Sequence, residues 1–163
     1  MMSEHYTTFA KYNAWANHRL YDACQKLTND DYMQDRKAFF GSIHHTLNHL
    51  LVVDKLWLSR AQKKEADFRA LNQILHDDLN SLLEARIKQD HDLILWSNTL
   101  SNDALESVIT YHTLAGEKCE MQMKWILSHL FNHQTHHRGQ VHNMLSQAGI
   151  NPPPLDLYYF LLK

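Results

Sequence analysis

Helix-breaking residues are scarce in this chain, and most of them stand outside the stretches with helical periodicity. The 163 residues include four glycines and three prolines, and the prolines are consecutive, at positions 152–154. Because glycine and proline end helices and mark turns, their scarcity favours a few long helices over many short strands. Four long helices in a chain of this length predict an all-α four-helix bundle, formed by one domain over residues 1–163.

Four segments place apolar residues three and four positions apart, which is the spacing of one helix face. They predict helices over residues 4–27, 43–61, 72–99 and 123–148. Ser42 is the expected N-cap of the second helix, because its hydroxyl can accept a hydrogen bond from the first turn. Gly149 and the three prolines are expected to end the fourth helix. The stretch 28–31 is interpreted as a break after the first helix.

Between the third and fourth helices the apolar period changes from helical to alternating. Weak alternation over residues 108–113 and 118–123 flanks Leu114-Ala-Gly-Glu117. This pattern predicts a short β-hairpin immediately before the last long helix. The final segment, residues 155–160, is too apolar for a free tail, so we expect it to pack back on the bundle.

Composition excludes several classes of protein. The net charge of −2, with acids and bases mixed along the chain, argues against binding to nucleic acid, which needs a basic patch. The longest apolar run, residues 50–53, is far too short to cross a membrane. Cys24 and Cys119 match no disulfide framework and no paired-cysteine motif. With no signal peptide expected, a cytoplasmic location is the simplest interpretation.

Two histidines interrupt the apolar stripe of the fourth predicted helix. The stripe consists of Ile126, Leu130, His133, His137, Val141 and Met144. His133 and His137 are one helical turn apart, so their rings project from nearly the same face. A buried polar ring without a partner costs about 1–3 kcal/mol. Two such rings, with a third from another helix, would suit a divalent transition metal.

The alternative is that these histidines are ordinary core residues, since one histidine in such a stripe is more often hydrogen-bonded than metal-bound. Two on one face, with a third available, favour a ligand role. His129 lies one turn before His133 and is either a competing ligand or a pocket wall. His136 and His142 lie off the stripe, where surface or supporting positions are expected.

The second predicted helix offers the third ligand. His49 is the polar member of a half-buried stripe, and His45, one turn earlier, could replace it. His44 points away from this face and is expected to be solvated. Asp54 falls in the main apolar stripe of the same helix, where an unpaired carboxylate would be costly. It would accept a proton from a ligand imidazole, or form an ion pair with Arg86 or Arg138.

Other residues and motifs narrow the choice of chemistry. Glu-x-x-His is absent, which argues against a carboxylate-rich di-iron bundle, and His-Glu-x-x-His and Gly-x-Ser-x-Gly are absent as well. Gly139 lies inside the fourth helix, where it costs roughly 1 kcal/mol relative to alanine, so we expect it to permit a close approach by a neighbouring segment. The four tryptophans are expected in the core; they are Trp15, Trp57, Trp96 and Trp125.

At these residues the chain resembles the DinB family, also described as DinB/YfiT-like metalloenzymes, which is distinct from the DNA polymerase of the same name. The patches that carry the resemblance are residues 12–17 (YNAWAN), 41–49 (GSIHHTLNH), 54–57 (DKLW) and 129–140 (HLFNHQTHHRGQ). The last of these is the most specific. Together with the proline stop and the apolar tail, the resemblance covers essentially the whole chain.

The resemblance implies an up-down-down-up four-helix bundle, often dimeric, with one divalent metal held by three histidines. By position these are His49, His133 and His137, and nickel or zinc is the expected metal. The spacing argument selects His133 and His137 independently, but only the resemblance separates His49 from His45. Related bundles include transferases and isomerases that use a low-molecular-weight thiol.

Three functions compete at this stage. The first is a metalloenzyme with an open three-histidine site, acting as a hydrolase or as a thiol-dependent transferase on a small molecule. The second is a non-catalytic metal-binding or stress-response protein, although closed structural zinc sites usually have four ligands. The third is a helical dimerisation module without metal, which must satisfy the stripe histidines by hydrogen bonds alone.

Overall fold

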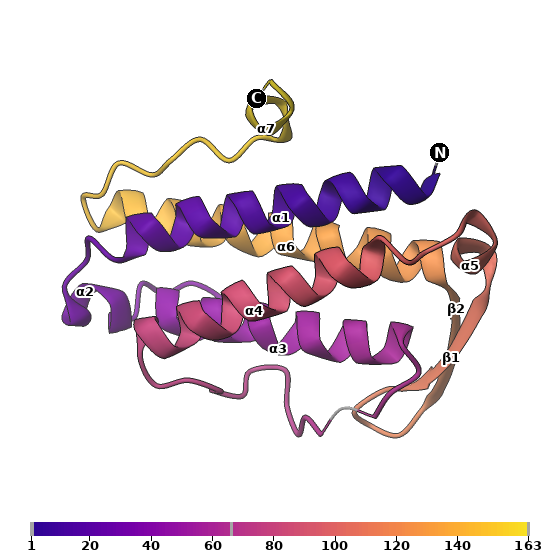
Figure 1. The fold of residues 1–163 in the computed structure, drawn as a ribbon. Helices are drawn as coiled ribbons and strands as arrows, with labels where there is room; N and C mark the ends of the chain where they lie inside the picture. The colour runs from indigo at the N-terminus through magenta and orange to yellow at the C-terminus, as the bar shows by residue number, and fades with distance from the viewer. Residues whose placement is uncertain (1, 66, 163) are drawn as a thin grey trace.

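The computed structural model describes residues 2–65 and 67–162, and four long helices dominate it (Figure 1). These are α1 (Met2–Cys24), α3 (Ile43–Ala61), α4 (Leu79–Ser97) and α6 (Met123–Gln147). Helix α1 packs against α4 and α6, and α3 packs against α6 and α4. Helices α3 and α4 run in the same direction, opposite to α1 and α6, which confirms the up-down-down-up bundle.

Short elements fill the connections. They are α2 (Asn29–Met33), α5 (Asn102–Glu106), β1 (Val108–His112), β2 (Lys118–Gln122) and α7 (Leu157–Leu161). Strands β1 and β2 pair antiparallel, with Val108 opposite Gln122 and His112 opposite Lys118. The predicted hairpin before the last long helix is therefore confirmed.

Local hydrogen bonds set the helix boundaries. The Ser42 hydroxyl accepts from the His45 backbone N–H, as expected of an N-cap. Helix α1 ends at Cys24 rather than at the predicted residue 27, and the predicted break at 28–31 is mostly helical, because Thr28 caps the short helix α2. Helix α4 begins at Leu79 and not at residue 72, because the Asp78 carboxylate accepts hydrogen bonds from the first-turn amides.

Asn48 explains why the chain before α4 is not helical. Its Oδ1 accepts from the backbone N–H groups of Leu75 and His76, at 2.9 and 3.1 Å, while its Nδ2 donates to the His76 carbonyl. Asn48 is fully buried on α3. One side chain thus satisfies the backbone of the α3–α4 connection and holds that connection against the bundle.

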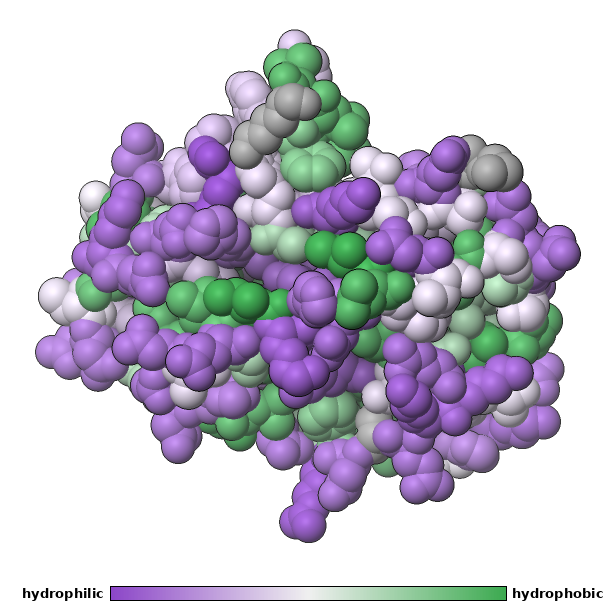
Figure 2. All heavy atoms as spheres, in the orientation of Figure 1, coloured by the Kyte–Doolittle hydropathy of each residue, from purple (hydrophilic) through white to green (hydrophobic). Residues whose placement is uncertain are grey.

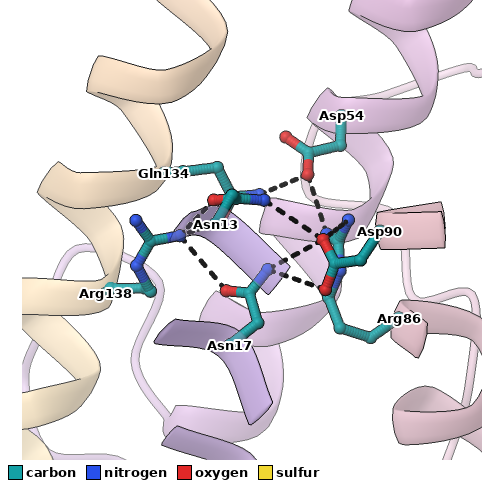
Figure 3. Close-up of polar contacts among 7 residues, drawn as sticks. All are labelled: Asn13, Asn17, Asp54, Arg86, Asp90, Gln134 and Arg138. Atoms are coloured by element: carbon teal, nitrogen blue, oxygen red, sulfur yellow. Dashed lines mark hydrogen bonds and ion pairs between the residues drawn. The ribbon is translucent and has the colours of Figure 1, made fainter. Parts of the chain in front are cut away.

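The interior consists of two apolar clusters with a polar layer between them. One cluster includes Leu20, Leu51 and Leu82, and the other includes Ala10, Leu58 and Leu93. Between them lie seven buried polar side chains, drawn in Figure 3: Asn13, Asn17, Asp54, Arg86, Asp90, Gln134 and Arg138. All four long helices contribute to this layer.

The ion pairs of Arg86 are the centre of this layer. Its Nη1 lies 2.8 Å from Asp54 Oδ2, and its Nη2 lies 2.8 Å from Asp90 Oδ1. Burial raises the pKa of Asp54, an effect that the Arg86 charge opposes. Burial alone would lower the pKa of Arg86, but the carboxylates of Asp90 and Asp54 raise it above its ordinary value. The two 2.8 Å contacts with a guanidinium, which stays protonated in proteins, are those of an ion pair.

Amide side chains close the layer into a ring. Asn13 and Asn17 donate to Asp90 and accept from Arg138 Nη1. Arg138 Nη1 also donates to Gln134 Oε1, at 3.1 Å, and Gln134 Nε2 donates to Asp54 Oδ2. Two cations and two anions are thereby linked across four helices without an excess of charge.

The C-terminal segment packs back on α1 through a few contacts, as expected. Tyr12 donates its hydroxyl hydrogen to the Leu155 carbonyl at 2.7 Å, and the Phe160 ring lies 5.9 Å from the Tyr12 ring and 5.7 Å from the Trp15 ring. Other apolar side chains of this segment face solvent, and Figure 2 shows them as a raised apolar knob. Leu161 and Leu162 are 58% and 65% exposed.

Three expectations about packing are wrong. Trp125 is 58% exposed, because it lies on the outer face of α6 beside the buried Ile126 and Leu127. Apart from the nearby backbone of α6 itself, no atom of the described residues lies within 4 Å of the position of a Cβ on Gly139, so this glycine does not serve a close helix contact. His44 is buried rather than solvated, since its Nδ1 lies 3.2 Å from the Tyr32 hydroxyl.

None of the described helices combines the length and the apolar character needed to span a membrane.

The polar layer leads to a prediction about stability. Replacing Arg86 by methionine removes the partner of two buried carboxylates, and we expect it to lower the free energy of unfolding by about 3–5 kcal/mol. Urea denaturation followed by circular dichroism measures this change.

Lys88→Met is the matched control on the same helix. Lys88 also pairs with an aspartate four residues later, Asp92, but its side chain is 78% exposed. Loss of this pair should change the free energy of unfolding by no more than about 0.5 kcal/mol. Equal losses in the two variants would contradict the stabilising role of the buried ring.

Candidate metal centre

Three histidines from two helices meet beside the polar layer. His49 comes from α3, while His133 and His137 come from successive turns of α6. Each offers a ring nitrogen, and these three atoms lie within 4.8 Å of one another. His49 Nε2 lies 3.0 Å from His133 Nε2. Among the described residues this is the one group of three or more potential ligands gathered closely enough to hold a metal ion.

In His49 and His137, the ring nitrogen that points away from the group, Nδ1, is fixed by a hydrogen bond. His49 Nδ1 lies 2.8 Å from the Leu71 carbonyl, and His137 Nδ1 lies 2.7 Å from Gln140 Oε1. Both oxygens can only accept, so these Nδ1 atoms must carry the proton. A neutral ring protonated at Nδ1 keeps its lone pair on Nε2. The two hydrogen bonds therefore set the tautomer and the orientation that a metal ligand needs.

Burial keeps the three rings neutral. It lowers the pKa of His49 to about 4, against the hydrogen bond to Leu71, and lowers the pKa of His133 to about 3, with a further contribution from His137. The pKa of His137 is lowered for the same reason. Each ring thus presents a lone pair at neutral pH, which is the form that binds metal.

The spacing of the rings fits one ion. Imidazole nitrogens bind zinc at about 2.0–2.1 Å, so two of them on one ion lie roughly 3 Å apart. The 3.0 Å between the Nε2 atoms of His49 and His133 agrees with this value. The donor set therefore fits a divalent transition metal.

The other histidines lie outside the group. His45 is exposed, and its Nδ1 lies 3.1 Å from the hydroxyl of the capping Ser42, so it does not replace His49. The His129 ring is 5.7 Å from the His133 ring and 4.9 Å from the Trp57 ring, which makes it a wall beside the group. His136 is exposed and contacts Gln140, a surface position as expected.

Asp54 belongs to the ion-pair ring and not to the metal group. Its carboxylate binds Arg86 and Gln134, whereas the outer nitrogens of His49 and His137 bond to Leu71 and Gln140. Of the two roles considered for Asp54, the structural ion pair with Arg86 is the correct one.

Three supporting groups were missed in the sequence. Gln140 follows His137 by three residues, so helical spacing could have identified it. The Leu71 carbonyl is a backbone group of an irregular segment, and no side-chain pattern marks it. The Phe40 ring stacks on His49 with 3.9 Å between ring centroids, and lies 5.4 Å from the His137 ring. It shields the cluster, but an aromatic residue before a helix does not predict such a contact.

Comparison with known proteins gives consistent matches over nearly the whole chain. The profile of the DinB family matches residues 2–162. Protein DinB of Bacillus subtilis (strain 168) is 28% identical over 171 residues, covering 99% of this chain and 98% of that protein. The uncharacterized protein YizA of the same organism is 25% identical over 150 residues, with 88% of each chain covered.

A solved structure shares the fold. A DinB-like protein from Bacillus cereus matches with a TM-score of 0.68, covering 88% of this chain and 91% of that one. At 19% sequence identity, this likeness concerns the arrangement of the helices alone.

The lowered pKa values predict how the metal-free protein responds to acid. The unfolded chain binds protons at its histidines below about pH 6.5, whereas folded His49 and His133 resist protonation until about pH 4 and 3. The contribution of these two histidines to the free energy of unfolding is therefore fully present above pH 6.5 and is lost as the pH falls towards 4. The free energy of unfolding, measured in urea with a chelator from pH 7 to 4.5, should show this loss.

His133→Gln isolates the contribution of one ring. It should make the pH dependence shallower, by at most about 1.4 kcal/mol per pH unit for the one proton removed. The same substitution at the exposed neighbour, His136→Gln, is the control for replacing a histidine of this helix. An unchanged slope in His133→Gln would contradict the neutral state of this half-buried ring.

Proposed function

The chain belongs to the DinB family, and on that premise we propose that it binds one divalent transition metal through His49, His133 and His137. The observation that carries this proposal is the pair of Nε2 atoms 3.0 Å apart, with a nitrogen of the third ring in the same group. Nickel and zinc suit a set of three neutral imidazoles, since neither requires carboxylate or thiolate ligands.

An open site favours a metalloenzyme. Three neutral ligands leave the charge of the ion uncompensated and leave room in its coordination shell, whereas closed structural zinc sites usually have four protein ligands. The chemistry that such an ion supplies is Lewis acidity, which activates water for hydrolysis or stabilises a thiolate for transfer. We therefore propose a hydrolase or a low-molecular-weight-thiol-dependent transferase that acts on a small molecule.

The chain's own residues would prepare the site for this chemistry. The Leu71 carbonyl and Gln140 hold two of the rings in the ligating tautomer. Phe40 covers His49 and His137 and restricts the access of bulk water. His129 stands next to His133, at the edge of the group, where it would contact an incoming substrate.

The alternative function is a non-catalytic metal-binding or stress-response protein. In that case the ion would only hold α3 and α6 together, and it would exchange slowly. A metal-free dimerisation module is the third candidate, and it would leave the three gathered ring nitrogens without a ligand role.

We further propose that the protein acts in the cytoplasm as a homodimer, without nucleic-acid or membrane partners. The exposed apolar residues of α7 and the following Leu162 offer a surface that a second copy could cover. Light scattering after size-exclusion chromatography would decide whether the protein is a dimer.

Metal content is the first prediction to test. Untagged protein purified without chelators should contain about one nickel or zinc ion per chain, measured by plasma mass spectrometry, and His137→Ala should lose it. His136→Ala changes the neighbouring exposed histidine and should retain the metal. Wild-type protein that stays metal-free after incubation with both ions would overturn the proposal.

Gln140 should strengthen metal binding without touching the ion. Gln140→Ala removes the acceptor that orients His137, and we expect the dissociation constant to rise about 10- to 100-fold. Competition with a chromophoric chelator measures this change. Asn143→Ala, an exposed position on the same helix, is the control. An unchanged dissociation constant in Gln140→Ala would show that the hydrogen bond to His137 contributes nothing to the site.

A further inference from the structure

One cavity of the described structure has a lining that does not include the three histidines. It has a volume of about 860 Å³ and lies between the end of α3, the chain after α3, and strand β1. Its charged lining residues are Arg60, Lys63, Lys64, Glu65 and Asp67. A cavity of this size accommodates a small organic molecule.

Arg60 is held rigidly at the wall of this cavity. Its Cζ lies 4.6 Å from the ring centroids of both Trp57 and Tyr111, and one Nη2–H donates to the His112 carbonyl at 3.0 Å. Contacts with two rings and a hydrogen bond fix the plane of the guanidinium. The side chain is therefore preorganised, which reduces the entropy lost when it binds a ligand.

The positive charge of Arg60 is not neutralised within the protein. No carboxylate of the described residues forms an ion pair with it, and Nη1 has no hydrogen-bond acceptor there. Arg86 and Arg36, by contrast, each pair with an aspartate. A half-buried arginine without a counterion is costly, and an anionic ligand would remove that cost.

The net charge of the cavity lining indicates how much negative charge a bound anion should carry. Three cationic residues face two carboxylates, Glu65 and Asp67, so the lining has an excess of one positive charge. This balance favours a monovalent anion over a polyphosphate. Leu56, Val108 and Leu114 supply an apolar wall for the rest of the ligand. A planar carboxylate on an apolar body matches both the fork of the guanidinium and this wall.

Ring contacts connect Arg60, at the cavity wall, to the histidine group. The Trp57 ring, which contacts Arg60, lies 4.9 Å from His129, and His129 lies 5.7 Å from His133. The α3–α4 connection contributes Lys63 and Lys64 to the cavity and the Leu71 carbonyl to His49. The Arg60 site is therefore a neighbour of the histidine group, with the Trp57 and His129 rings between them.

We propose that Arg60 anchors the carboxylate of a small organic monoanion in this cavity. A small organic monoanion is then the class of substrate for the metal centre, and this assignment rests on the proposed function. The binding of an anion at Arg60 does not rest on it.

Benzoate is the probe, and benzamide is its neutral counterpart of the same shape. Nuclear magnetic resonance titration of metal-free and zinc-incubated wild-type protein should detect benzoate in both samples, with benzamide binding at least about tenfold more weakly. The Nε–H resonance of Arg60 should shift with benzoate. This signal reports contact at the guanidinium without any substitution.

Arg60→Gln should weaken benzoate at least about tenfold in the metal-free protein, and Arg60→Lys, which keeps the charge but loses the planar fork, by a smaller factor. Lys118→Gln is the control for charge. Lys118 lies on β2, beside the cavity-lining strand β1, pairs with Glu120, and does not line the cavity. It should leave the affinity unchanged. Thermal unfolding of each variant verifies that it is folded. If Arg60→Gln does not fold, the Arg60 resonance of the wild-type protein decides whether benzoate contacts this side chain.

The outcomes separate the two proposals. Benzoate binding that requires zinc and survives Arg60→Gln would place the anion at the metal and overturn the Arg60 site. Equal affinities for benzoate and benzamide, or an Arg60 resonance that does not move, would overturn it as well. Benzoate binding at Arg60 in a protein that takes up no metal would uphold the anion site and refute the metal centre instead.

Discussion

Arg86 of α4 binds the buried carboxylates of Asp54, from α3, and Asp90, one turn further along α4, and the packing of the four long helices depends on this cluster. Burying these charges costs several kcal/mol per ion, and close pairing with further hydrogen bonds offsets that cost, although Asp54 Oδ1 and Arg86 Nε find no hydrogen-bond partner among the described residues. Asn13, Asn17, Gln134 and Arg138 complete the ring. The apolar clusters on either side of the ring can tolerate small sliding or rotation of the helices, because apolar contacts are not directional. The hydrogen bonds and ion pairs of the ring are directional, and the ring therefore specifies the register of the helices.

The same constraint positions the three histidines. Gln134 and Arg138 of α6 belong to the ring, and each immediately follows one of the histidines of the group, His133 and His137. A rotation of α6 that displaced the histidines would also break the ring. On α3, Asn48 ties down the connection to α4, and the neighbouring His49 bonds to the Leu71 carbonyl of that connection. The site is thus built on rigid helices and on a loop that the bundle core secures.

The sequence predicts the bundle and most of the candidate site, because helical spacing is a local property. The four long helices, the hairpin and the Ser42 cap follow from apolar periods and capping chemistry. The start of α4 does not, since a buried asparagine on another helix decides it. Spacing alone brings His133 and His137 to one face, but the choice of His49 over His45 depends on the rotation of α3 against α6. The partners of Asp54 and Arg60 are likewise set by contacts between elements distant in the sequence.

The central claim is that His49, His133 and His137 together hold one metal ion. X-ray absorption at the metal edge of the nickel- or zinc-loaded protein tests it most directly, because the multiple-scattering signal counts imidazoles. We predict three imidazole nitrogens at about 2.0–2.1 Å, with the remaining positions filled by oxygen or another light atom. Fewer than two imidazoles, or a first shell containing cysteine sulfur, would contradict the assignment.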